Sequence, residues 1–218
     1  MNVNTRALAI FDFDKTLITV DSFRLFSMTA ADTWWKTILV FALAVLCKSG
    51  IIDNARYKIS VLRLVWAGRE EEQKSRILKA LYRSMNSSQN AETVSLMLDH
   101  LNRNDEVAII SASPDFYLRP YVESSWSNIR VFASAYQEHD GKLFLRNMYR
   151  EEKANCARKL SEDLSPKEVV LYTDHISDAP LMKMANLTMI VRPSKRICEK
   201  LNKMGVKFVA VGGDVREE

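Results

Sequence analysis

The sequence predicts an α/β fold with a doubly wound parallel sheet, an inserted all-helical subdomain and a small β-hairpin. Two observations carry this prediction. Six short apolar runs are continuous rather than alternating, as in strands covered on both faces, and helical stretches lie between several of them. Such a β-then-α rhythm is typical of a parallel sheet with helices on both faces, whose ligands bind beyond the carboxyl ends of the strands.

The expected strands fall in one early run and a later group. They are residues 7–13, 106–113, 129–136, 168–174, 187–193 and 206–211. Within residues 129–148, Asp140-Gly141 is the expected turn of the β-hairpin. Some of the runs end in acids or hydroxyls, which should gather at one edge of the sheet: Asp12 and Asp14, Ser111 and Ser113, and Asp174.

The interval 19–104 differs from the rest because it is rich in helix formers, poor in glycine and free of proline. It predicts several helices inserted between the first two strands. The expected domains are therefore a Rossmann-like core of residues 1–18 and 105–218 and a helical subdomain of residues 19–104. The subdomain has 12 Lys and Arg against 8 Asp and Glu, which is the whole net charge of +4. This excess indicates either scatter over solvated helices or a field that attracts an anionic substrate or membrane surface.

Composition excludes some classes of protein. The net charge is modest and no long basic block is present, so nucleic acid is not an expected partner. Three cysteines without CxxC spacing argue against a disulfide framework and a structural zinc site, and they favour the reducing cytoplasm. The N-terminal apolar run is short and ends in acids, so no signal peptide is expected. The sequence does not indicate an oligomeric state.

The stretch "FDFDKT" places two carboxylates where chemistry is expected. Side chains alternate along a strand, so Asp12 and Asp14 point the same way and can converge on one phosphorus and one metal. Phosphoryl transfer needs a nucleophile, a proton donor and acceptor, Mg²⁺ and cations for the phosphate oxygens. A carboxylate nucleophile would form an acyl phosphate and split one difficult hydrolysis into two easier steps.

Further groups of the required kinds stand at or near the other strand ends. With them, the chain resembles the haloacid dehalogenase superfamily of phosphohydrolases over nearly its whole length. The four signatures appear in order as Asp12-Phe13-Asp14-Lys15-Thr16, Ser111-Ala112-Ser113, Lys153, and Asp174 with Asp178. More narrowly, the chain is similar to the phosphoserine-phosphatase-like branch, in which a helical cap is inserted between the first two signatures.

This resemblance implies a role for each signature residue. Asp12 would be the nucleophile, and Asp14 would protonate the leaving oxygen and later activate water, with Lys153 as the third catalytic group. The implied phosphate-binding residues are Thr16, Ser111, Ala112 and Lys153. The implied ligands of Mg²⁺ are Asp12, Asp14 through its backbone carbonyl, Asp174 and Asp178, with Asp178 either ligating or orienting.

Three positions depart from the common family motifs. Lys15 stands where the common form has glycine, and Thr173 and His175 flank Asp174 where the common form has small residues. None of these changes removes a charged catalytic group. They leave the expected reaction class intact and bear on substrate and rate.

The resemblance places substrate choice in the cap. Asp21 stands where phosphoserine phosphatases carry an acid for the substrate ammonium, although an aspartate there also suits a helix N-cap. Arg56, Lys58 and Arg63 are candidates for binding a substrate carboxylate or a second phosphate. A solvated helix face explains these three cations equally well.

One cap segment is unusually apolar. Ten uncharged residues, 38–47, follow Trp34 and Trp35, and this run is too short to span a bilayer. It is either a buried cap helix or an interfacial helix with tryptophans at headgroup depth. Some members of the resembled branch act on phosphatidylglycerophosphate or lysophosphatidate, which an interfacial helix would suit.

Together these features predict a Mg²⁺-dependent phosphomonoesterase that acts through an aspartyl phosphate on a small phosphorylated metabolite. One alternative is a phosphatase of a lipid phosphate, peripheral at the inner face of the membrane. The other is a catalytically silent binding module that retains the fold.

Overall fold

The computed structural model describes residues 6–139 and 142–212. Within them, the chain forms a seven-stranded sheet in the order β4-β3-β2-β1-β5-β6-β7. The strands are β1 (Leu8–Phe11), β2 (Glu106–Pro114), β3 (Arg130–His139), β4 (Lys142–Arg146), β5 (Val169–Thr173), β6 (Leu187–Val191) and β7 (Phe208–Val211). All neighbours are parallel except β3 and β4. The prediction of a doubly wound α/β core is confirmed.

The expected hairpin corresponds to β3 and β4, which pair antiparallel from Ala135 with Arg146 onward. Its expected turn, Asp140-Gly141, lies outside the described residues. The sheet therefore has one antiparallel edge strand on an otherwise parallel core.

β1 is the central strand, with β2 on one side and β5 on the other. The chain fills one half of the sheet first and then the other, so the strand order reverses beside β1. Ligands of doubly wound sheets bind at this reversal, outside the carboxyl ends of the strands. Asp12 follows β1 directly and Asp174 follows β5, so both stand at that point.

Helices cover both faces of the sheet, which explains why all four residues of β1 are buried. Side chains alternate along the strand, so Ala9 and Phe11 face one layer while Leu8 and Ile10 face the other. The first layer contains α5 (Ala91–Asn102) and α6 (Asp115–Ser125), and the second contains α7 (Glu151–Leu164), α8 (Ala179–Met182) and α9 (Lys195–Lys203).

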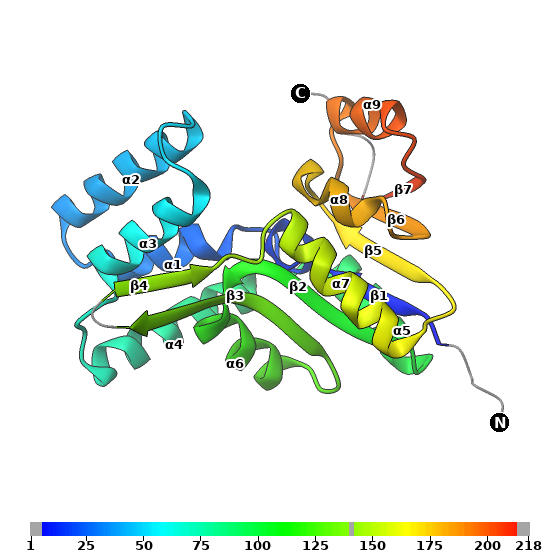
Figure 1. Ribbon diagram of the computed structural model, residues 1–218. Helices are drawn as coiled ribbons and strands as arrows, with labels where there is room; N and C mark the ends of the chain where they lie inside the picture. Colours follow the sequence, from blue (N-terminus) through cyan, green and yellow to red (C-terminus); the bar gives the residue numbers. More distant parts are fainter. Residues whose placement is uncertain (1–5, 140–141, 213–218) are drawn as a thin grey trace.

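The remaining helices gather at one end of the molecule, on the left in Figure 1, where α3 also contacts β4. They are α1 (Ser22–Ala30), α2 (Trp34–Lys48), α3 (Asn54–Val65) and α4 (Glu71–Ser87). None of the described helices has the length and apolar character needed to cross a bilayer.

The last helix of the inserted interval belongs with the sheet. α5 packs on β1 and β2, and the Nε2 atom of His100 lies 2.9 Å from the hydroxyl of Tyr172 on β5. The boundary expected at residue 104 therefore assigns to the cap a helix that covers the core. We propose α1–α4, residues 22–87, as the cap.

The cap is joined to the core through aromatic side chains. Phe26 of α1 lies 5.5 Å from Phe116 and 5.6 Å from Tyr117 between ring centroids, and Trp66 stacks on Phe116 at 4.8 Å. One continuous apolar cluster runs from α1 through α6 to the sheet.

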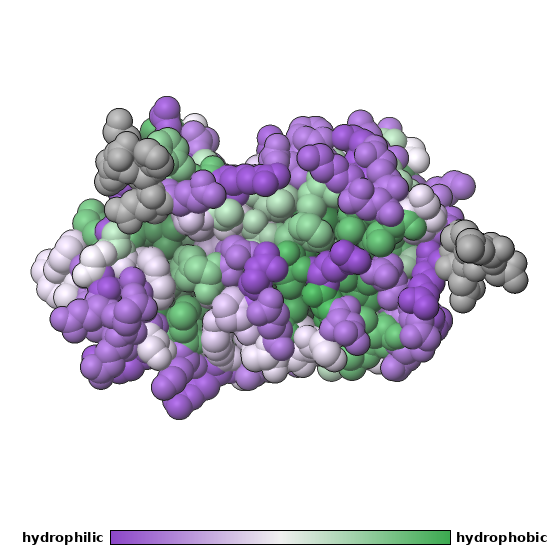
Figure 2. All heavy atoms as spheres, turned by 60° about the horizontal axis from the view of Figure 1, so that its bottom comes forward, coloured by the Kyte–Doolittle hydropathy of each residue, from purple (hydrophilic) through white to green (hydrophobic). Residues whose placement is uncertain are grey.

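On the underside of the molecule, hydrophilic side chains are interspersed with hydrophobic ones and line the rim (Figure 2).

Candidate active site

The first signature forms a tight turn after β1. Asp12 caps this turn by accepting a hydrogen bond on Oδ1 from the backbone N–H of Phe13, at 2.8 Å. The backbone N–H of Asp12 donates to the carbonyl of Tyr172 at 2.9 Å, so the turn begins from a residue still tied to β5. This anchoring fixes the Asp12 carboxylate at the carboxyl end of the sheet.

Lys15 occupies the sharpest point of the turn, with φ 55° and ψ 7°. This left-handed conformation suits glycine, which the common family motif has here, and it is uncommon for a residue with a Cβ. The Lys15 side chain is exposed, so the turn accommodates it at the rim. The departure from the motif therefore adds a cation beside the site.

Lys153 is a buried cation that links two signatures. It lies in the first turn of α7 with only 3% of its side chain exposed, and its Nζ atom is 2.9 Å from Asp12 Oδ1 and 3.0 Å from Asp178 Oδ2. Burial favours the neutral amine, but the two carboxylates outweigh burial and raise the pKa of Lys153. The structure thus holds a permanent positive charge between the first and fourth signatures.

The acids around this lysine are crowded. Burial raises the pKa of Asp12 to about 8, against the opposing effect of Lys153 and with further increases from neighbouring acids. Burial also raises the pKa of Asp174 to about 7, which Lys15 partly offsets. One lysine does not neutralise this group of acids, so the site favours binding of an additional positive charge.

Asp14 is held by hydroxyl and backbone donors. Its Oδ1 accepts from the backbone N–H of Ser22 at 2.6 Å, and its Oδ2 accepts a hydrogen bond from Ser113 Oγ. Ser22 Oγ in turn lies 2.8 Å from Ser113 Oγ and 3.0 Å from the hydroxyl of Tyr117. Burial raises the pKa of Asp14, as does Asp21, although the two serines lower it. The carboxyl is fixed in place, and its raised pKa favours the protonated form.

The predicted phosphate-binding residues take different positions. Ser111 is buried at the end of β2, where its Oγ accepts from the backbone N–H of Ser113 at 3.1 Å. The carbonyl of Ala112 accepts from Ser134 Oγ at 2.8 Å. Thr16 is fully buried, its Oγ1 has no hydrogen-bond partner, and its carbonyl accepts from Asn90 and Thr93 at the start of α5. Its position suits support of the turn better than contact with a ligand.

Two cavities open beside these groups. One, of about 520 Å³, includes Lys15, Asp174 and His175 on one side and Arg196 and Lys200 of α9 on the other. The other, of about 560 Å³, lies between the cap and the core. Its lining includes the polar-site residues Asp14, Asp21, Lys58, Ala112 and Ser113 and the apolar residues Phe23, Met28, Val40, Phe41, Ala44 and Val45.

The structure places the cap residues that were predicted to bind substrate in different environments. Lys58 is buried, and its Nζ donates to the carbonyl of Ala112 at 2.5 Å and to Asn147 Oδ1 at 3.0 Å. Burial lowers the pKa of Lys58 to about 8. Arg56 instead points away from the site, with 77% of its side chain exposed and an ion pair to Asp53 at 3.4 Å. Its expected role in substrate binding is not supported, because it faces solvent from the same helix.

The position of Asp21 is compatible with both roles that the sequence left open. It caps α1 by accepting a hydrogen bond from the backbone N–H of Arg24 at 2.8 Å. It also lies beside the same cavity as Asp14 and Lys58. The third cap cation, Arg63, is exposed on α3 and belongs to neither cavity.

The donor set of the site fits a hard cation. Among residues 6–139 and 142–212, no three acidic, His or Cys side chains form a preformed metal cluster. The buried Oδ1 of Asp178 nevertheless has no hydrogen-bond partner, while its Oδ2 accepts from Lys153 and from Thr173 Oγ1. Mg²⁺ uses few protein ligands and retains several waters. An unpaired carboxylate oxygen amid the acids therefore fits an ion that completes its shell with water and substrate oxygens.

Reasoning from the sequence did not assign a role to several residues that hold the site. Ser22 and Tyr117 orient Asp14 and Ser113, and Asn147 accepts from Lys58 and donates to Asn54 Oδ1 at 3.1 Å. Ser22 carries a local signal, since it directly follows a helix-capping aspartate near the first signature. Asn147 carries none, because it follows β4, the second strand of the hairpin, and only the fold brings it to the cap.

Comparisons with known proteins identify the family and the fold. A family model of haloacid dehalogenase-like hydrolases matches residues 9–183. A protein with unknown function from Bordetella pertussis Tohama I has a similar structure, with TM-score 0.82 and 20% identity over 94% of this chain and 99% of that chain. A HAD family hydrolase from Salmonella enterica serovar Typhi has TM-score 0.73 and 14% identity over 93% of this chain and 67% of that chain.

A substrate-bound phosphoserine phosphatase has TM-score 0.69 and 16% identity over 97% of this chain and 95% of that chain. No curated protein matches the sequence. At these identities the solved structures establish a common fold. The family match is stronger evidence, because it spans most of the chain and every signature position from Asp12 to Asp178. The chain therefore belongs to the haloacid dehalogenase-like hydrolases.

Proposed function

We propose that this hydrolase is a Mg²⁺-dependent phosphomonoesterase that works through an aspartyl phosphate on Asp12. The observation that carries the proposal is the ion pair of the buried Lys153 with Asp12 and Asp178, at the reversal of the strand order. The structural similarity to phosphoserine phosphatases, one of them solved as a phospho-aspartyl intermediate analogue, supports the same chemistry.

In the first step, the Asp12 carboxylate attacks the phosphorus and the bond to the leaving oxygen breaks. The contacts from Phe13 N–H and Lys153 Nζ both go to Oδ1, so we assign the attack to Oδ2. Lys153 then serves two purposes: it opposes the rise in the pKa of Asp12 that burial causes, and it offsets repulsion between the acids and the phosphate dianion. Ser111 would donate its hydroxyl hydrogen to a phosphoryl oxygen, beside Ala112, with Thr16 supporting the turn.

Asp14 is the proposed general acid and base. Its raised pKa favours the protonated form that can give a proton to the leaving alkoxide. The same carboxylate then takes a proton from the water that hydrolyses the acyl phosphate, returning Asp12 to its starting state. Hydrogen bonds from Ser22 and Ser113 hold the carboxyl in position for both transfers.

Mg²⁺ would be held by Asp12, the carbonyl of Asp14, Asp174 and Asp178. When bound, it would neutralise charge on the phosphoryl oxygens and help to orient them. The unpaired Oδ1 of Asp178 and the raised pKa values of Asp12 and Asp174 support this assignment. His175 keeps an exposed surface, but partial desolvation beside the site lowers its pKa, so it is a neutral neighbour of the site near pH 7.

Metal removal tests the proposed function. Hydrolysis of p-nitrophenyl phosphate should require Mg²⁺, stop in EDTA and return when Mg²⁺ is added in excess. Asp174→Ala should raise the Mg²⁺ concentration needed for half-maximal rate by roughly 10-fold or more, because a charged ligand is lost. Asp163→Ala, an exposed acid at the far end of α7, is the matched control. Full activity in EDTA would exclude the metal, and no activity under any condition would favour a silent binding module.

A second prediction separates two cap cations. Lys58→Met should lower kcat/KM by about 10- to 100-fold, because it removes charged hydrogen bonds to Ala112 and Asn147 beside Asp14. Arg56→Met, from the exposed face of the same helix, should stay within about 2-fold of wild type. Steady-state kinetics with p-nitrophenyl phosphate measure both variants. Equal losses would mean that α3 acts through general stability, and no loss in either would remove Lys58 from the site.

The substrate is a phosphomonoester whose leaving group the cap selects. We propose a phosphomonoester with an apolar leaving group, met by a cytoplasmic enzyme in peripheral contact with the membrane, rather than a small polar metabolite. The cavity beside Asp14 supports an apolar leaving group, since Phe23, Val40, Phe41 and Val45 contribute to its wall.

A further inference from the structure

The outer face of α2 is apolar along its length. Of the fifteen residues of this helix, Val40 alone is buried. Trp34, Ile38, Phe41 and Val45 recur every three or four positions and form one stripe along the helix, and Trp35 and Leu39 lie beside it. We call these six exposed side chains the α2 face. The exposed fractions are Trp34 76%, Trp35 43%, Ile38 57%, Leu39 45%, Phe41 53% and Val45 61%.

This pattern is unusual for a helix at the surface. A surface helix normally turns charged and polar residues to water, and a helix that is apolar all round is normally buried. α2 is apolar on both sides, because its inner side packs on α1 and α3 while its outer side stays open. Contiguous exposed apolar surface of this kind marks an interaction site.

The segment around the α2 face is cationic. Residues 32–66, which include α2 and α3, contain five Lys and Arg and two acids, Asp32 and Asp53. Asp32 pairs with Lys36 at 2.9 Å and Asp53 with Arg56 at 3.4 Å, whereas Lys48 at the end of α2 is exposed outside these pairs. The remaining excess of positive charge favours a partner of negative charge.

The α2 face is continuous with the active site. Phe41 and Val45 are exposed on this face, and they also line the cavity that leads to Asp14 and Ser113. An apolar tail lying along α2 could therefore stay in contact with apolar side chains while its phosphate reaches the catalytic groups.

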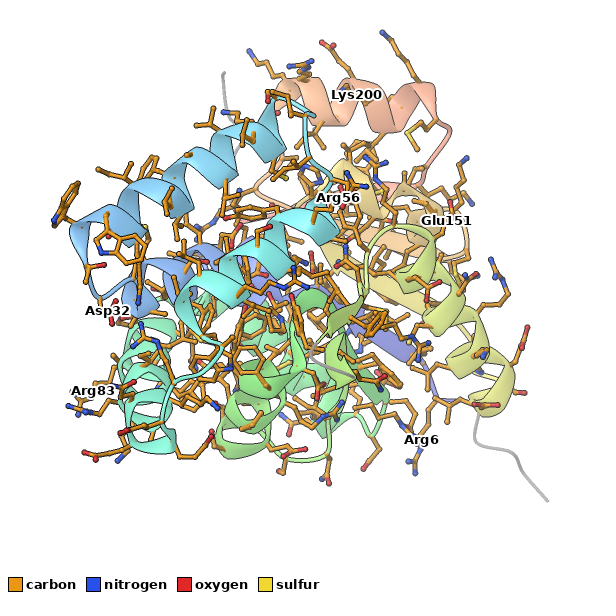
Figure 3. The ribbon with its side chains drawn as sticks, turned by 60° about the vertical axis from the view of Figure 1, so that its left-hand side comes forward. Arg6, Asp32, Arg56, Arg83, Glu151 and Lys200 are labelled. Atoms are coloured by element: carbon orange, nitrogen blue, oxygen red, sulfur yellow. The ribbon has the colours of Figure 1, made fainter. Side chains whose placement is uncertain are left out.

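Cations also lie on α9. Arg196 and Lys200 of this helix line the other cavity, and both are exposed. α2 and α9 both reach the upper side of the molecule, where Figure 3 labels Lys200 (Figures 1 and 3). An apolar helix and a basic helix thus lie toward the same side of the molecule.

We propose that the α2 face docks on an anionic lipid bilayer and that the substrate is a phosphomonoester with an apolar tail embedded in that bilayer. The identity of the substrate rests on the proposed phosphatase function, whereas the docking does not. α2 would lie in the plane of the interface, since a helix of this length measures roughly 22 Å and is too short to span. Trp34 and Trp35 would lie at headgroup depth, with Lys48 and the α9 cations near lipid phosphates.

Vesicle flotation tests the docking. The intact protein should float with vesicles of phosphatidylcholine and phosphatidylglycerol in equal amounts, and weakly or not at all with pure phosphatidylcholine. Trp34→Ser with Ile38→Ser should lower binding to the anionic vesicles by about 10-fold or more, because two exposed apolar anchors are lost. Phe144→Ser is the matched control, since Phe144 is 54% exposed on β4, outside the α2 face. It should bind as wild type does.

Kinetics test the substrate. With a long-chain lysophosphatidate presented in the anionic vesicles, the Trp34/Ile38 double variant should lose about 10-fold or more in rate. Its turnover of p-nitrophenyl phosphate should stay within about 2-fold of wild type, because both residues lie outside the cavity beside Asp14. That unchanged turnover also shows that the variant is folded.

The outcomes distinguish this inference from the proposed function. A wild type that hydrolyses p-nitrophenyl phosphate but ignores anionic vesicles overturns the docking and leaves the phosphatase standing. Vesicle binding without any hydrolysis overturns the phosphatase and leaves the docking standing. Equal binding to neutral and anionic vesicles would overturn the proposal that docking requires anionic lipid. A dimer that the double variant converts to a monomer, without vesicle binding, assigns the α2 face to a second copy of this chain instead.

Discussion

Replacing Asp12 by asparagine is expected to lower turnover of p-nitrophenyl phosphate by at least about 10³-fold without unfolding the protein. The amide has nearly the same volume, and its oxygen can still accept the hydrogen bond from Phe13 N–H and one from Lys153. Lys153 also keeps its contact with Asp178 at 3.0 Å. The loss is therefore specific to the attacking negative charge.

Two measurements check this expectation. Thermal unfolding followed by circular dichroism should give a Tm close to that of wild type, and rapid acid quenching with labelled substrate should trap phosphate on wild type alone. The trapped label should be released by hydroxylamine, which cleaves acyl phosphates. Asp163→Asn makes the same chemical change on an exposed residue of α7 and should leave activity unchanged. An Asp12→Asn protein with activity within a few fold of wild type would rule out Asp12 as the nucleophile.

Much of the catalytic core could be predicted because its signals are local. A continuous apolar run ending in acids identifies both β1 and Asp12, since burial on two faces and the reversal of strand order impose that pattern. Lys153 is different, because its own surroundings in the sequence indicate only a solvated helix start. The resemblance to a family singled it out, and the structure then places it against Asp12 and Asp178.

The cap could not be predicted to the same depth, because its properties depend on which helix face meets which neighbour. Arg56 and Lys58 are two residues apart on one helix, yet one is exposed and the other is buried against Ala112. For α2, an apolar run on all sides gives no periodic signal of which side is covered. Its exposure follows from the placement of α1 and α3, which the sequence of α2 does not contain.

Replacing Asp14 by asparagine is expected to disable turnover through the loss of proton transfer, by about 10²- to 10⁴-fold for an alkyl phosphate. The variant should keep the local structure, because its amide oxygen can accept from Ser22 N–H and its NH₂ group can donate to Ser113 Oγ. It cannot give a proton to a leaving alkoxide or take one from water. Steady-state kinetics with two substrates separate the loss of proton donation to the alkoxide from the loss of proton removal from water.

The two substrates differ in how much their leaving groups need a proton. An alkoxide is a strong base and must be protonated as it departs, whereas p-nitrophenolate is stable without a proton. Asp14→Asn should therefore cost the alkyl phosphate more than p-nitrophenyl phosphate, and the remaining loss for the aryl ester should come from hydrolysis of the intermediate. Asp53→Asn is the matched control: it changes an exposed carboxyl outside the cavity and keeps an N-cap for α3, so it should leave the ratio of the two rates unaltered. Equal losses for both esters in Asp14→Asn would mean that this carboxyl positions the first turn rather than moving the proton.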